Sequence, residues 1–360
     1  MNQHGMNLVE LAQEIMRRAE SKKDFVAETP DLVFGENALT VGTAGRFPLT
    51  DHAHGQIADR VGIPKRYYDR MKADAPALLA GNVNHWFQET PERRMIRTLD
   101  GQARAFLSDR YHRIDNERIA DAVLPVLVAD CGHGAVVSCC ITDSKLYLQA
   151  LFPRLEGEVK TGDPVQGGVI ISNGEIGNGA LDIRPMIYRL VCTNGLITGH
   201  VAEDARLRRN HIGRRVETGE DYSVYGDDTL QADDRALTLK IRDSIRALAQ
   251  PQLFNRILAE LRQATQQQPA SNPIAAVSEL GKAYPMVQGE RDSILMNLIR
   301  HGDDSKWGMA NAITETANAH PSYDRAVELQ ALGGRVLELK PTDWRQIASA
   351  NSSEMDLLAA

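Results

Sequence analysis

A chain of 360 residues with 42% hydrophobic and 25% charged residues has the composition of a folded globular protein, which excludes a disordered one. Its net charge of -7 argues against duplex nucleic acid binding by the whole surface, although a local basic groove stays compatible with it. The length is large for a single core, so we expect two or three sub-structures.

The four cysteines, Cys131, Cys139, Cys140 and Cys192, show neither the CxxC spacing nor the Cys/His spacing of a metal site. They indicate small buried thiols in a reducing compartment. The N-terminus carries acids where a secretory leader needs apolar residues, and no apolar run approaches the ~20 residues of a membrane-spanning helix. We therefore expect a cytoplasmic protein that does not enter a membrane and holds no metal or cofactor.

Residues 1–90 are predicted to form a helical N-terminal region. Apolar residues recur at helical spacing from 7 to 18, and two short β-like runs around 35–37 predict a hairpin. Thr50 or Asp51 can cap a helix, and a turn at 62–64 leads into a second helix with Arg66 and Arg70. This spacing fits a DNA-reading helix, but a packed helical hairpin explains it better.

Residues 91–225 are predicted to form an antiparallel α+β core. Asp100 and Gly101 mark a hairpin turn, and Asp115 with Asn116 caps a following helix. A further hairpin spans 135–152. The stretch 167–199 predicts two more strands. A helix that starts near Arg184 or after Asn194 is an alternative for part of this stretch.

Residues 226–345 are predicted to be a helical C-terminal region, and 346–360 a tail. The helical pattern covers 236–268, with an interruption near Pro251, and then 272–284, 290–300 and 306–319. The expected fold class is α+β: an antiparallel β-sheet core with packed helices, followed by a mostly helical C-terminal part.

Catalytic signatures are missing from the sequence. Gly174, Gly177 and Gly179 follow a GxxGxG spacing that matches no phosphate-binding loop, so turn chemistry explains them better. The interpretation that this is not an enzyme is therefore preferred. The alternative is a site assembled from distant residues such as Asp109, His112, Glu175 and Asp182.

Arginines interleaved with aromatic residues form the most informative pattern. They concentrate at 93–113 and again at 206–215, and Tyr111 and Tyr188 accompany them. Guanidinium groups pair with phosphates and aromatic rings stack on bases, at about 1–3 kcal/mol per stack, so this pattern is typical of single-stranded nucleic acid binding. With about five phosphate contacts, the logarithmic salt slope of binding would be near -3.5.

Two motifs carry a family resemblance. The first is RAFLSDRYHRIDN at 104–116, and the second is NGEIGNGALDIRPMIYRLVCTNGLI at 173–197. Over roughly residues 47–335 the chain resembles a family of proteins carried by phages, plasmids and integrated elements. This family is catalogued as domain of unknown function nine-three-two. The resemblance implies that genes of this family occur among phage and plasmid genes. It implies no established reaction.

The expected topology is also similar, more weakly, to the core of phage single-strand annealing proteins. These share a fold with the eukaryotic recombination mediator of the fifty-two type, which forms rings that hold single-stranded DNA in a basic groove. That likeness implies a homo-oligomer whose groove includes arginines of both concentrations. The candidate nucleic-acid-binding residues are Arg97, Arg104, Arg110, Tyr111, Arg113, Arg184, Tyr188, Arg189, Arg206, Arg208, Arg209, Arg214 and Arg215.

The preferred hypothesis is a phage- or mobile-element-type protein that binds single-stranded DNA for annealing or protection during recombination or replication. The first alternative is a regulator or anti-host factor that binds a protein. In that case the acidic residues at 217–234 would mimic DNA. The second alternative is the enzyme described above.

Overall fold

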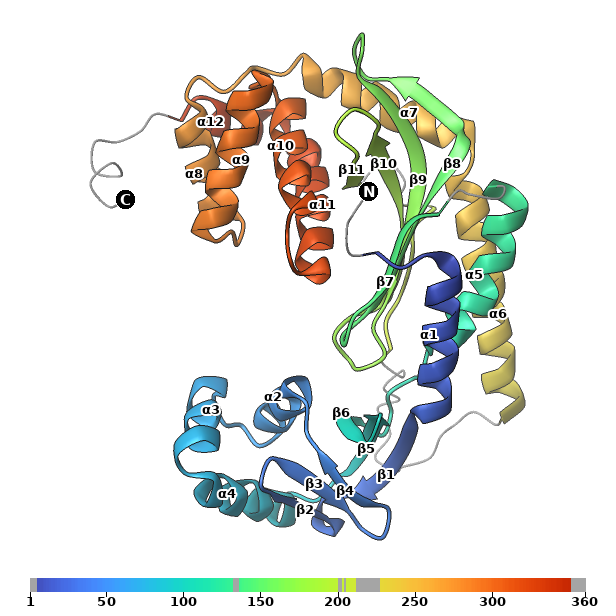
Figure 1. Cartoon of the computed structure of the whole chain (residues 1–360), viewed down its shortest axis with the longest axis vertical. Coiled ribbons are helices and arrows are strands. Elements are labelled where there is room, and N and C mark those ends of the chain that lie inside the picture. The colour runs from blue at the N-terminus through green and yellow to red at the C-terminus, as the bar shows by residue number, and fades with distance from the viewer. Residues whose placement is uncertain (1–4, 132–135, 200–202, 204, 212–226, 351–360) are drawn as a thin grey trace.

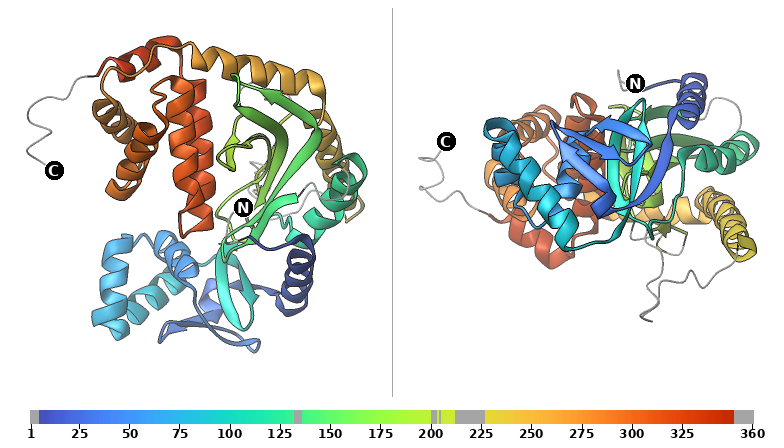
Figure 2. Two further views of the ribbon diagram at one scale, coloured as in Figure 1. Left: turned by 45° about the horizontal axis from the view of Figure 1, so that its top comes forward. Right: turned by 90° about the horizontal axis from the view of Figure 1, so that it is seen from below.

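The structure is a computed structural model that describes residues 5–131, 136–199, 203, 205–211 and 227–350. A large curled sheet occupies the middle, a smaller α/β unit built from N-terminal residues lies at one end, and C-terminal helices face one side of the sheet (Figures 1 and 2). The expected α+β class with an antiparallel core is confirmed.

The N-terminal unit combines short strands with helices around one hydrophobic cluster. Its elements are β1 (Lys23–Glu28), a 3-10 turn (Thr29–Asp31), β2 (Leu32–Gly35), β3 (Ala38–Val41), β4 (Gly45–Pro48), α2 (Asp51–Arg60), α3 (Lys65–Asp74), α4 (Pro76–Glu89), β5 (Arg93–Leu99) and β6 (Gln102–Ser108). β2, β3 and β4 form one 3-stranded sheet, and β1, β5 and β6 form another.

Local chemistry fixes the turns of this unit as the sequence predicts. Glu36 and Asn37 have φ of 48° and 58°, and Asp100 and Gly101 have φ of 51° and 77°, which are the left-handed conformations of tight hairpins. Thr50 caps α2 by accepting a hydrogen bond from the backbone N–H of Ala53 at 3.3 Å. Both hairpins and the capped helix are confirmed.

The expected boundary at residue 90 falls inside this unit. β5 pairs with β1 along its whole length, and Ile96, Ala103 and Phe106 of the β5–β6 hairpin are buried in the N-terminal cluster. Burial of these side chains requires the earlier strands and helices, so the hairpin belongs with them. The unit is also richer in strands than the helical region that the sequence predicts.

The large 6-stranded sheet is antiparallel, with the order β11-β10-β9-β8-β7 and β12 added to β10. The strands are β7 (Val136–Ile141), β8 (Leu146–Glu158), β9 (Pro164–Asn173), β10 (Leu181–Arg189), β11 (Asn194–Ile197) and β12 (Leu207–Arg209). The alternative prediction of a helix near Arg184 or after Asn194 is wrong, because β10 and β11 occupy these two places and pair with each other.

One face of this sheet carries the main core. Leu148, Val169 and Ile183 point to that face and pack against helices, which lie on the outer side of the curled sheet in Figure 1. Those helices are α1 (Leu8–Ser21), α5 (Asn116–Cys131), α6 (Asp227–Leu248) and α7 (Pro251–Thr265). The first two helices of the predicted C-terminal region therefore cover the sheet.

The remaining helices form a second cluster on the opposite side of the sheet. They are α8 (Pro273–Ala283), α9 (Gln288–His301), α10 (Lys306–Asn318), α11 (Tyr323–Glu338) and α12 (Pro341–Ala348). The helices expected at 272–284, 290–300 and 306–319 are confirmed. α11 lies within the predicted helical region 226–345, although the sequence analysis gives no bounds for it, and α12 runs past residue 345 into the predicted tail. Gly334 lets α11 lie against β11, because a Cβ there would be 1.9 Å from the carbonyl oxygen of Ile197. Within the described residues no helix is both long and apolar enough to cross a membrane.

Candidate nucleic-acid interface

The face of the large sheet that is turned away from the main core carries charge. Along β10, Leu181 and Ile183 are buried in the core, whereas Asp182 and Arg184 alternate to the other face. Asp182 lies opposite Arg208 on β12. We call Arg184, Arg206 and Arg208, which surround Asp182 on this face, the basic cluster.

Asp182 pairs with two of the three arginines of the basic cluster. Arg206 forms a bidentate pair with Asp182: Nε donates to Oδ1 at 3.0 Å and Nη2 donates to Oδ2 at 2.9 Å. Arg184 Nε lies 3.1 Å from the same Oδ2, and Arg208 is exposed with no carboxylate partner among the described residues. Glu338 also acts on Arg184 and Arg206, and Glu203 on Arg206, so the positive charge available to an anion is that of exposed Arg208.

The charged groups around Arg184 are of both signs. Burial lowers its pKa below the usual arginine value, Arg206 and Arg208 lower the pKa further, and Asp182 and Glu338 oppose this. Burial removes water from around the Arg184 guanidinium. A bound anion beside it would supply interactions in place of that water.

A pocket of about 380 Å³ adjoins the basic cluster. Arg184 of β10 lines it together with Arg325 and Arg335 of α11 and Tyr284, the residue that ends α8. Arg325 is held by Glu290 at 2.7 Å and 2.8 Å, whereas Arg335 lies over the Tyr284 ring at 5.3 Å and has no carboxylate partner among the described residues. Glu328 also lines the pocket and pairs with Arg325 at 2.7 Å, so the pocket combines the cations of Arg184 and Arg335 with an aromatic ring and one paired carboxylate.

Two of the predicted arginines are buried in the protein. Arg97 has no exposed side-chain surface, and it donates to Asp24 at 2.9 Å, to Asp115 at 2.6 Å and to the carbonyl oxygen of Glu175 at 2.9 Å. Arg104 is 7% exposed and donates to Glu175 Oε2 at 2.8 Å. Both arginines of the hairpin therefore point toward Glu175 and not toward solvent, so they are not available to a ligand.

The two motifs of the resemblance meet in this buried polar network. Glu175 Oε1 accepts from the backbone N–H of Asn116 at 2.7 Å, and Asn173 donates to the side chain of Asn116 at 2.9 Å. Tyr111 donates its hydroxyl to the carbonyl oxygen of Gly174 at 3.0 Å and stacks on His211 at 5.1 Å. Tyr111 is thus engaged within the protein.

The two basic concentrations lie side by side. The backbone N–H of His112 donates to the carbonyl oxygen of His211 at 2.9 Å, which brings exposed Arg110 and Arg113 near the segment after β12. Arg113 keeps 56% of its side chain exposed beside Asp24. Arg209 is half exposed and pairs with Asp233 of α6 at 2.8 Å.

The other predicted residues lie apart or beyond the described chain. Tyr188 is half-buried on the charged face, and burial raises the pKa of its hydroxyl. Arg189 is paired with Asp163 at 2.5 Å and donates to Cys192 Sγ at 3.2 Å. Arg214 and Arg215 are outside the described residues, as is the acidic segment from 217 to 226.

The residues named for the enzyme alternative have separate partners. Glu175 is bound by Arg104, Asp182 by Arg206, and His112 Nε2 lies 3.6 Å from Asp234. Asp109 contacts Ser108 at 3.4 Å. Among the described residues these groups do not form one cluster.

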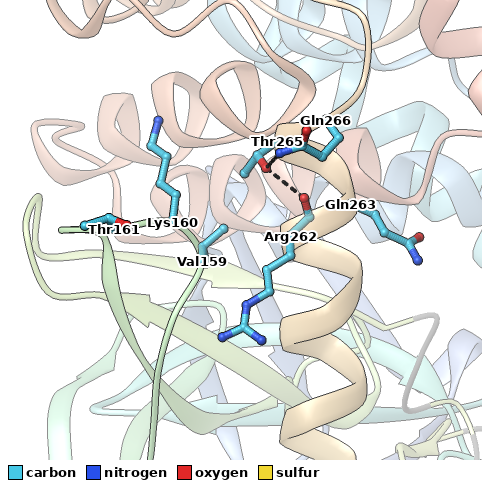
Figure 3. A pocket seen from close by; sticks show the side chains of 7 residues that line it. All are labelled: Val159, Lys160, Thr161, Arg262, Gln263, Thr265 and Gln266. Carbon is cyan, nitrogen blue, oxygen red and sulfur yellow. Dashed lines mark hydrogen bonds between the residues drawn. The ribbon is translucent and has the colours of Figure 1, made fainter.

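A hollow of about 490 Å³ also lies between the loop joining β8 to β9 and the end of α7. Figure 3 shows its lining, in which the Arg262 side chain lies along α7. Arg262 donates twice to the carbonyl oxygen of Glu158, at 3.0 Å and 2.8 Å, and Lys160 pairs with Asp303 at 2.5 Å. Its cations are used within the protein, so the pocket at Arg184 is the better candidate.

Sequence reasoning missed Tyr284, Arg325 and Arg335. They lie about a hundred residues or more after Arg184 in the chain, on helices whose pattern resembles that of any packed helix. No local motif marks them, because only the packing of α11 beside the sheet brings them to Arg184.

Comparison with known proteins gives a family and no activity. No curated protein and no solved structure matches the chain. The family model described as "Domain of unknown function (DUF932)" matches residues 105–345, from β6 to α12 and including most of the first motif and all of the second. The chain therefore belongs to this family of unknown function.

Proposed function

We propose that the protein binds single-stranded DNA across the charged face of the large sheet. The observation that carries this proposal is the basic cluster, in which Arg184 and Arg206 share the carboxylate of Asp182, while Arg208, opposite Asp182 on β12, is exposed without a carboxylate partner among the described residues. Phosphate groups supply the missing negative charge, and a flexible single strand follows a curved face that a duplex does not.

The adjoining pocket supports the same function. Arg335 and Arg184 offer cations to a phosphate, and the Tyr284 ring beside them offers a stacking surface for a base. Arg110 and Arg113 are exposed near the segment after β12, where His112 and His211 share a backbone hydrogen bond. This combination binds without reading sequence, as strand annealing or protection requires.

The proposal includes a homo-oligomer and a cytoplasmic role in a phage or mobile element, in recombination or replication. Light scattering with and without single-stranded DNA tests the assembly. A ring of several subunits is the expected result, and a monomer under both conditions contradicts this part of the proposal.

Fluorescence anisotropy of a labelled single-stranded oligonucleotide, titrated with salt, tests the binding itself. The variant pair is Arg208→Ala with Arg335→Ala, because neither arginine has a carboxylate partner whose charge would be left buried. Loss of two phosphate contacts should make the salt slope shallower by about 1.4. Duplex DNA of the same length should bind more weakly than the single strand.

The matched control is Arg242→Ala on α6, on the outer side of the sheet, where Arg242 pairs only with Asp243. It should leave affinity and slope unchanged. The binding function is rejected if the wild-type protein does not bind at low salt. The assignment of this face is rejected if the double variant keeps the wild-type slope.

A further inference from the structure

A cysteine, a histidine and a glutamate converge where the turn after β10 meets the C-terminal helices. They are Cys192 in the β10–β11 turn, His301 at the end of α9 and Glu315 in α10. One ligand atom of each lies within 4.8 Å of the other two. Among the described residues this is the one group of three or more such side chains that meets this spacing.

The orientation of these groups suits a cation. His301 Nε2 lies 2.7 Å from Glu315 Oε2, and the other carboxylate oxygen, Oε1, accepts from Arg300 at 2.5 Å. Arg300 therefore fixes the carboxylate through one oxygen and leaves the other for a single bond to a metal. A metal ion that replaces the proton between Nε2 and Oε2 would use both as ligands.

The sulfur is also held in place. Arg189 Nη1 donates to Cys192 Sγ at 3.2 Å, and the charge of Arg189 is balanced by Asp163 at 2.5 Å. Hydrogen bonds to ligand atoms from groups outside the metal's own coordination orient those atoms and tune the site. A His–Glu ion pair explains why His301 and Glu315 lie together. It does not explain why Cys192, whose Sγ accepts a hydrogen bond from Arg189, lies beside them.

The donor set identifies the ion. Thiolate, imidazole and carboxylate together favour Zn²⁺, whose bond lengths of about 2.0–2.3 Å place tetrahedral ligand atoms roughly 3.3–3.6 Å apart. Small rotamer changes bring the three atoms to that spacing. The His301 side chain is 31% exposed and that of Glu315 19%, so the ion can enter from solvent and a water can take the fourth position.

We propose that Cys192, His301 and Glu315 form a Zn²⁺ site that ties the β10–β11 turn to α9 and α10. The site is separate from the basic cluster and does not depend on DNA binding. With one thiolate and one carboxylate, the protein neutralises the charge of the ion. Binding stabilises the folded chain, because the unfolded chain does not bring the three ligands together.

Co²⁺ titration of the full chain tests the site by absorption, since tetrahedral thiolate coordination gives a charge-transfer band in the near ultraviolet and intense visible bands. A one-to-one complex with both features is expected. Competition with a chromophoric chelator then gives the Zn²⁺ affinity. Each of Cys192→Ser, His301→Gln and Glu315→Gln should weaken it at least about tenfold.

The control variant is Cys140→Ser, a half-buried cysteine on β7 that lies outside the group. It should keep the spectrum and the affinity. The proposal is overturned if wild-type protein gives no thiolate band with Co²⁺, or if Cys192→Ser retains that band. The wild-type spectrum decides the question even if a variant does not fold. Zn²⁺ should also raise the melting temperatures of the wild type and of Cys140→Ser by more than those of the three ligand variants.

Discussion

The ion pair between Arg104 and Glu175 offers a quantitative test of the buried network. Its side chains are only 7% and 5% exposed, and Nη2 lies 2.8 Å from Oε2. At that distance the Coulomb attraction is about 6 kcal/mol at an effective dielectric constant of about 20, and desolvation of both ions offsets much of it. The net value of the pair is therefore small, but the cost of removing one partner is large.

Glu175→Gln leaves Arg104 buried without its carboxylate while the backbone N–H of Asn116 keeps an acceptor. Arg104→Met leaves the Glu175 charge buried instead. Each single variant should lower the free energy of unfolding by about 3–5 kcal/mol. The double variant removes both charges, so its cost should be smaller than the sum of the single costs by about 2 kcal/mol or more.

Urea unfolding, followed by far-ultraviolet circular dichroism and by tryptophan fluorescence, measures these differences. The reasoning is refuted if each single variant costs less than about 1 kcal/mol, or if the two costs add without coupling. Either result would mean that water or other groups solvate the charges.

Two further predictions concern stability. Burial lowers the pKa of His54 to about 4, so between pH 6.5 and 4 the unfolded chain takes up a proton that the folded chain does not. His54 should therefore account for a fall in stability of about 3 kcal/mol as the pH drops through this range. Burial lowers the pKa of His211 to about 4 as well, so in urea unfolding as a function of pH His54→Gln should lose only its own share of the dependence. The exposed control His85→Gln should keep the wild-type profile, and an unchanged profile in His54→Gln would contradict the assignment. Gly334→Ala should lower the free energy of unfolding by about 3 kcal/mol, because the new Cβ would meet the Ile197 carbonyl. Gly81→Ala has no atom within 4 Å of its Cβ and should stabilise α4 by up to about 1 kcal/mol. Equal melting temperatures for the two variants would rule out the close contact at Gly334.

The sequence by itself determined the features that depend on neighbours along the chain. The turns at Asn37 and Gly101 form where their residues tolerate a left-handed backbone, and the cap at Thr50 needs only the next few residues. The α+β class and most helices follow from hydrophobic spacing in the same way. α11 lies in the predicted helical region 226–345, but the sequence gives neither its bounds nor its packing against the sheet.

The tertiary structure alone decided which charges are available. Arg97, Arg104 and Arg208 look alike in the sequence, yet the first two are buried against carboxylates and the third is exposed. An arginine's environment is set by which distant carboxylate or helix the fold brings beside it, and local pattern carries no information about that distance. The same reason hid Arg335 beside Arg184 and Cys192 beside His301, because their convergence depends on how the C-terminal helices lie against the sheet.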